Sequence, residues 1–119
     1  MSPQQTLAVA RRYHQGWSSG NYEQSIDLLA PSLTVEVPIN DYPSAESFAQ
    51  ALRNFGELVT HVELLSEMAN DDEAMVLYDL QARQLGQLRV AEHFTIADGK
   101  IITLRQIHDT APVRAAGLG

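Results

Sequence analysis

The sequence predicts an α+β fold in which three N-terminal helices pack on one face of a cone-shaped, curved antiparallel (mixed) β-sheet. Apolar residues recur at helical spacing in the first half of the chain, whereas period-two alternation runs through the second half. Asp98-Gly99 lies between the last two strand-like runs and favours a tight hairpin, because both turn residues need positive φ. Helices followed by consecutive strands are typical of α+β proteins, and helices over a concave sheet leave a cavity between the layers.

The first helix has a clear start and stop. Ser2 can cap it, Pro3 suits its first position, and Gln5 stands where a capping box needs Glu or Gln. Gly20 is a natural end. Its apolar face is expected to carry Leu7, Ala10, Tyr13 or His14, and Trp17.

Two shorter helices are expected next. One runs from about Asn21 with Tyr22, Ile26 and Leu29 on one face, and Pro31 should end it. The other begins at Ser44. Its apolar stripe is predicted to comprise Phe48, Leu52, Phe55 and Val59.

Alternating residues predict five strands. The first lies between the second and third helices, and the other four follow the third helix without interruption. Their expected ranges are residues 33–37, 60–69, 73–83, 88–96 and 100–109. We therefore expect one domain over residues 1–109, followed by a loose Ala/Gly-rich tail over residues 110–119.

Composition excludes several classes of function. The 119 residues include no cysteine, which removes disulfides and thiol catalysis. The formal net charge is −7, and only Arg11-Arg12 are adjacent cations, so neither nucleic acid nor an anionic membrane is an expected partner. The sequence has no apolar run of membrane-spanning length and no signal-peptide core, which predicts a cytoplasmic protein.

Three stretches of the chain resemble a known superfamily. They are Arg12-Tyr13 with Trp17 and Gly20-Asn21-Tyr22, then Leu33–Pro38, then Ala91–Ile101. In order and spacing they are similar to the nuclear transport factor 2-like superfamily, in particular its SnoaL-like and ketosteroid-isomerase-like branches. The resemblance covers roughly residues 7–109 and implies the cystatin-like fold. This fold hosts enzymes, binding modules and interaction domains alike.

The resemblance also implies roles for individual residues. Tyr13 falls where the isomerases keep an oxyanion-binding tyrosine, and Glu92 falls where they keep a protonated carboxylic acid as the second donor. The isomerase general base falls on Val37, and the aspartate that SnoaL-type cyclases use falls on Gln106. Neither Val37 nor Gln106 can act as a base, so neither activity transfers directly.

Tyr13 and Glu92 each allow two interpretations. Tyr13 either donates to a ligand oxygen or fills the core with its hydroxyl satisfied locally. Glu92 shares a strand face with Val90 and Phe94. If that face lines the cavity, burial raises the pKa of Glu92 and makes it an acid near neutrality. Otherwise it faces outward or pairs with an arginine such as Arg83 or Arg105.

His108 is the remaining candidate for a base. It alternates with Gln106, Leu104 and Ile102, and the resemblance places that face on the cavity. The alternative is a partly exposed histidine at the strand end, bonded to the backbone. His93 is expected to face outward, and His14 and His61 to lie at the surface or a helix boundary. No histidine pair has metal-ligand spacing, so we predict no metal. Proton-transfer chemistry of the kind considered next needs no cofactor, so none is expected.

The leading functional hypothesis is a protein that binds a small, apolar, oxygen-bearing molecule and moves a proton in an isomerase, cyclase or dehydratase type of reaction. Catalysis would use Tyr13, Glu92 and His108. The expected ligand-binding residues are Trp17, Val37, Phe48, Phe55, Phe94 and Gln106. The alternative is a non-catalytic module with a filled cavity. Both are compatible with a homodimer through the sheet face, because the strands are apolar on both sides.

Overall fold

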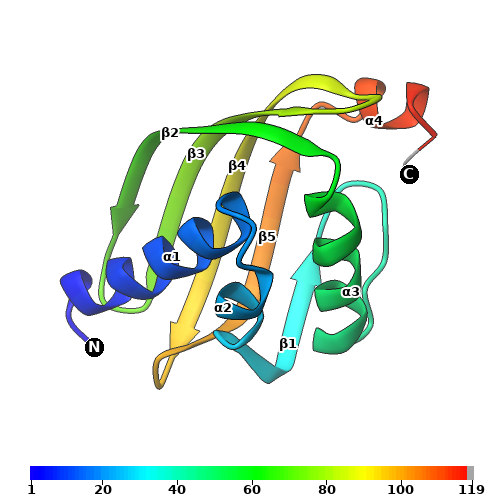
Figure 1. Ribbon diagram of the computed structural model, residues 1–119. Coiled ribbons are helices and arrows are strands. Elements are labelled where there is room, and N and C mark those ends of the chain that lie inside the picture. The colour runs from blue at the N-terminus through cyan, green and yellow to red at the C-terminus, as the bar shows by residue number, and fades with distance from the viewer. Residues whose placement is uncertain (118–119) are drawn as a thin grey trace.

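The computed structural model describes residues 1–117 and confirms the predicted α+β class. Three helices and five strands follow one another in the predicted order, and a fourth helix lies near the C-terminus (Figure 1). The helices are α1 (Pro3–Ser18), α2 (Tyr22–Ile26), α3 (Ala45–Gly56) and α4 (Ala111–Ala115). The strands are β1 (Leu29–Glu36), β2 (Val59–Ala69), β3 (Glu73–Ala82), β4 (Gly86–Ala97) and β5 (Lys100–His108).

The five strands form one mixed, curved sheet that does not close. Its order is β1-β5-β4-β3-β2, with β1 parallel to β5 and the other neighbours antiparallel. Helix α1 packs against β2, β3 and β4, and α3 packs against β1, so both cover the same face of the sheet (Figure 1). The core lies between these helices and the inner sheet face. None of the helices within residues 1–117 is long and apolar enough to cross a membrane.

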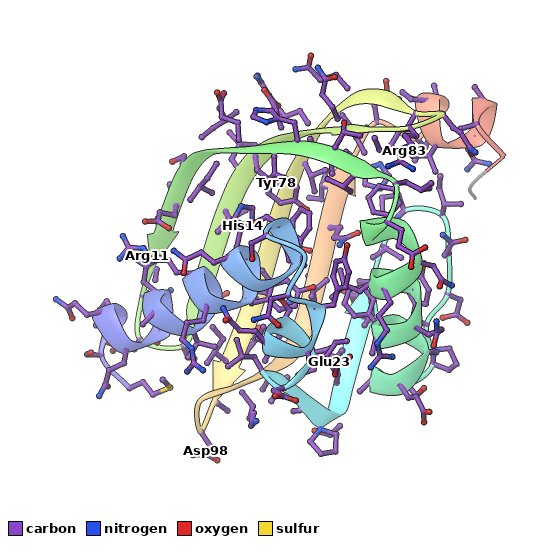
Figure 2. The ribbon with its side chains drawn as sticks, viewed as in Figure 1. Arg11, His14, Glu23, Tyr78, Arg83 and Asp98 are labelled. Carbon is purple, nitrogen blue, oxygen red and sulfur yellow. The ribbon has the colours of Figure 1, made fainter. Side chains whose placement is uncertain are left out.

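Local sequence signals act as predicted at both ends of the chain. The Ser2 hydroxyl accepts from the Gln5 backbone N–H at 3.2 Å, and the Gln5 side chain accepts from the Ser2 backbone N–H, which completes the capping box. Asp98 and Gly99 have φ of 53° and 76°, the positive values that a type I′ turn needs. Asp98 lies at the tip of the β4–β5 hairpin (Figure 2).

The second helix is shorter than the sequence predicts. It ends at Ile26, and Leu29 and Pro31 belong to β1, where Leu29 is paired with Ile101 of β5. Proline is tolerated there because β1 is an edge strand with one unpaired side. Val59 likewise belongs to β2, opposite Ala82, and not to the third helix.

Two further expectations at the C-terminal end were wrong. Ile102 was expected on the same face as Leu104, but Ile101 is the residue buried with Leu104, because the register of β4 and β5 shifts between Thr95 and Ile96. The segment expected to be a loose tail contains α4, which is one turn long and leaves Val113 half-buried against the core. Residues 118–119 of the predicted tail lie outside the described residues.

A close approach of α2 to α1 fixes the position of the helix turn that carries Tyr13. Gly16 provides the space, since a Cβ atom there would lie 2.4 Å from Oγ of Ser25 and 2.9 Å from its backbone nitrogen. The buried Ser25 hydroxyl donates to the backbone carbonyl of Tyr13. This bond comes from outside α1 and holds the helix in place beside the cavity.

Candidate functional site

A cavity of about 340 Å³ lies between α1, α3 and the inner face of the sheet. Residues 37–44 and α4 border it on the outer side, through Pro38, Tyr42 and Val113 among others. Eight of the nine residues that the sequence analysis assigned to a site line this cavity. They are Tyr13, Trp17, Val37, Phe48, Phe55, Glu92, Gln106 and His108.

Glu92 is a buried carboxyl group on an apolar wall. Its exposed fraction is 1%, and its strand neighbours Val90 and Phe94 are buried with it. Burial raises its pKa from 4.5 to about 7, and interactions with the Gln106 amide and the Tyr78 hydroxyl limit that rise. Gln106 Nε2 donates to Oε2 at 2.7 Å. Within residues 1–117, Oε1 has no hydrogen-bond partner.

Tyr13 brings a second unpartnered polar atom to the same cavity. Its side chain has no exposed surface, and its ring packs edge-on against Phe94 at a centroid distance of 5.3 Å. Its hydroxyl has no partner among the residues that the structure describes. Burial and the nearby Glu92 carboxylate raise the pKa of Tyr13 well above its usual value, so the hydroxyl keeps its proton. The site therefore combines two potential donors in an apolar surround.

His108 lies on β5, the strand next to that of Glu92, two residues beyond the partner of Glu92. Register pairs Glu92 with Gln106 and Val90 with His108, on the same inner face. Nδ1 of His108 is 3.0 Å from the Asp109 carbonyl oxygen, which can only accept, so Nδ1 carries the proton. This arrangement leaves Nε2 as an acceptor. Both interpretations of His108 apply, because its ring bonds the backbone and its side chain also lines the cavity. The side chain is partly buried.

Phe94 is the one predicted lining residue that does not reach the cavity. It is fully buried beneath Tyr13, because α1 lies directly over this part of β4. The alternative pairing of Glu92 with an arginine does not occur for Arg105, which bonds Glu36 and His93 on the outer face. His93 also lies 2.8 Å from Glu73 and faces outward as expected.

His14 was expected at the surface or a helix boundary, and the structure buries it. Its exposed fraction is 5%, and its ring centroid lies 5.0 Å from that of Tyr78 and 5.2 Å from that of Trp17. His14 of α1 lies next to Tyr78 of β3 (Figure 2). The buried face of α1 is wide enough to include both Tyr13 and His14, because the helix contacts β2, β3 and β4. Burial lowers the pKa of His14, an effect that Glu67 partly offsets. His61 is exposed.

The comparisons with known proteins assign the chain to a family. The SnoaL-like domain model matches residues 10–104. The chain belongs to this family. Its fold is similar to that of a protein from Kribbella flavida, with 25% identity over 94% of this chain and 93% of that one, at a TM-score of 0.87.

Two solved structures at lower identity share the fold of this SnoaL-like domain. One is a candidate ketosteroid isomerase from Kribbella flavida, with 18% identity over 92% of this chain and 81% of that one, at a TM-score of 0.79. The other is an LEH-like epoxide hydrolase from M. tuberculosis, with 16% identity over 96% and 90% of the two chains, at a TM-score of 0.76. No curated protein matches the chain.

Tyr78 is a site residue of this SnoaL-like domain that the sequence analysis missed. It lines the cavity from β3, is buried, and interacts with Glu92. Its pKa is raised well above the usual value by burial and by Glu92. The alternation of Val76, Tyr78 and Leu80 places Tyr78 on the inner face, so the signal was present in the strand pattern. Among residues 1–117, no three His, Asp or Glu side chains lie close enough together to hold a metal ion.

We expect Glu92→Gln to make the SnoaL-like domain more stable than the wild type above about pH 7 but not below about pH 4.5. The native state keeps a proton on Glu92 that the unfolded chain releases, because the pKa is raised from 4.5 to about 7. That stabilisation is fully present below the unfolded pKa and is lost as pH rises through the folded pKa. As pH rises from about 4.5 to about 7, the free energy of unfolding of the wild type should therefore fall by roughly 3 kcal/mol. The variant should not show this fall.

Urea unfolding of the wild type and of Glu92→Gln across this pH range measures the difference between their free energies of unfolding. Glu63→Gln is the matched control, since Glu63 is exposed on β2 and carries the same charge change. A difference between wild type and Glu92→Gln that stayed constant with pH would contradict the raised pKa.

Proposed function

We propose that this SnoaL-like domain binds a small, largely apolar molecule bearing a carbonyl oxygen and transfers a proton at the adjacent carbon. The reaction class is that of an isomerase, cyclase or dehydratase, with no cofactor. The observation that carries the proposal is the buried pair of Glu92 and Tyr13. Each has a polar atom without a partner in the described residues, and both line one cavity.

An enolate-like oxygen is the species that this pair suits best. Tyr13 keeps its proton, and Glu92 is protonated in about half of the molecules near pH 7, so both can donate to one ligand oxygen. Donors fixed in an apolar cavity stabilise developing negative charge without reorganising during the reaction. An apolar surround favours the neutral form of Glu92, as it does for the carboxylic acid of ketosteroid isomerase.

His108 is the proposed base. Nε2 is the free acceptor of its ring, and the side chain lines the same cavity two residues along β5 from Gln106. Val37 and Gln106, which occupy the base positions implied by the resemblance, also line the cavity. Gln106 instead orients the carboxyl group of Glu92. The proposed base on β5 would remove the proton, while the two donors on α1 and β4 bind the ligand oxygen.

Fluorescence of Trp17, the only tryptophan of the chain, tests the ligand cavity. Titration with small aromatic ketones such as 4-phenyl-2-butanone should give a saturable change in emission. Tyr13→Phe should weaken binding by about tenfold, because the hydrogen bond from its hydroxyl is lost. An emission spectrum that no ketone alters, in a chain where quencher cannot reach Trp17, would contradict the proposal.

The alternative, a dimerisation module with a filled cavity, is not favoured by a cavity of about 340 Å³.

A homodimer through the outer sheet face remains part of the proposal. Leu77, Ala91 and Ile107 form a cross-strand apolar row on that face, and Ile107 is 69% exposed. The charged pair Arg89–Asp79 flanks the row, so a two-fold copy would meet complementary charges. Sedimentation should give a dimer that Ile107→Glu dissociates.

A further inference from the structure

Within residues 1–117, the lining of the cavity includes one carboxyl group and no lysine or arginine. Its titratable lining groups are Glu92, His108 and three tyrosines, Tyr13, Tyr42 and Tyr78. Among the described residues that line it, none is a lysine or an arginine. His108 is the only one that can be positive, and it is partly exposed. The cavity therefore repels carboxylates and phosphates whenever Glu92 is ionised, and it offers them no partner of opposite fixed charge when Glu92 is neutral.

The same cavity is rich in aromatic surface. Trp17 and Tyr78 form one wall, with their ring centroids 5.3 Å apart, and Phe48 and Phe55 of α3 form another. The faces of such rings attract a cation within about 6 Å of the ring centre. The negative net charge of the whole chain, −7, acts in the same direction.

We propose that this cavity also binds protonated arylalkylamines, whose ammonium group donates to Oε1 of Glu92 while the hydrocarbon part packs against Trp17 and Tyr78. The proposal shares the cavity with the proposed function but does not require turnover. It follows from an acceptor atom that has no donor in the described residues, beside aromatic rings that favour a cation.

The two ligand classes need opposite states of Glu92. A carbonyl ligand needs its neutral form as a donor, and an ammonium ligand needs its carboxylate as an acceptor. With the pKa of Glu92 raised to about 7, amine binding should strengthen as pH rises through that value. His108 is the other group lining this cavity that can carry a positive charge, so its contribution must be separated from that of Glu92 by substitution.

The test is calorimetric titration of the intact chain with 2-phenylethylamine at about pH 6 and about pH 8.5, where the amine is protonated throughout. We expect binding about tenfold tighter at the higher pH, in proportion to the ionised fraction of Glu92. 3-Phenylpropionate, an anion of similar size, should not bind at either pH. Equal affinity at both pH values, or preference for the anion, would overturn the inference.

Glu92→Gln assigns the effect to this residue. At the higher pH, the affinity of the variant for 2-phenylethylamine should be at least about tenfold lower than that of the wild type, because the charge-assisted hydrogen bond is gone. Its affinity should also no longer depend on pH. The far-ultraviolet circular dichroism spectrum of the variant should match that of the wild type, which shows that the variant is folded. Glu63→Gln should match the wild type. A pH dependence that persisted in Glu92→Gln would belong to His108 and overturn the inference.

The two proposals fail in different ways. Ketone binding without amine binding would leave the proposed function intact and remove the further inference. Amine binding without ketone binding would do the reverse.

Discussion

Glu92→Gln should slow proton exchange at the carbon next to the carbonyl of a bound ketone by about 10²–10⁴-fold. An amide can occupy the place of the carboxyl group and can donate, but it is a far weaker acid. It therefore supplies much less stabilisation as negative charge develops on the ligand oxygen. The buried, partly protonated state of Glu92 is the property that the substitution removes.

Incorporation of deuterium from heavy water into 4-phenyl-2-butanone, followed by NMR, measures this reaction and does not require the natural substrate. Tyr13→Phe should reduce exchange by about 10²–10³-fold, the usual effect of losing one oxyanion donor. The double variant should not exchange above the uncatalysed rate, whereas Glu63→Gln should retain full activity. Full activity of the double variant would end the proton-transfer proposal.

Phe94→Ala should cost about 3–5 kcal/mol of the free energy of unfolding, the largest effect on stability that we expect from one core substitution. Phe94 has no exposed surface and supports the ring of Tyr13 from below. Removing it leaves a hole that α1 and β4 cannot close, because the sheet fixes one side and the Gly16–Ser25 contact fixes the other.

Phe55→Ala is the matched control for this prediction. This substitution also removes an aromatic ring, but Phe55 is only half-buried and borders the existing cavity. It should therefore cost less than about 2 kcal/mol in urea unfolding, since little new void is created. Equal losses for the two variants would mean that Phe94 does not carry the packing of Tyr13.

The parts of the site that could be predicted from sequence are those set by strand alternation. Glu92 lies between Val90 and Phe94 at positions i±2, so burying those two residues necessarily buries the carboxyl group. The same rule placed Gln106 and His108 together. Helix periodicity placed Tyr13 and Trp17 on the inward face of α1, because their neighbours at three- and four-residue spacing are apolar.

The parts that could not be predicted depend on how elements lie over one another. Phe94 and Glu92 share a strand face, but α1 covers Phe94 and leaves Glu92 at the cavity wall. His14 is buried because the curved sheet contacts more of α1 than one stripe. Leu29 joins β1 because β5 pairs with it from the other end of the chain, a contact that no local pattern records.

The most direct measurement is an NMR titration of the side-chain carboxyl carbon of Glu92, assigned by comparison with Glu92→Gln. The proton-transfer proposal and the pH dependence of the amine-binding proposal both require a carboxyl group that changes its charge near neutrality inside the cavity. We predict a midpoint of about 7 for this carbon. A midpoint near 4.5, the ordinary value for glutamate, would show an ionised Glu92 at neutral pH and would contradict the account.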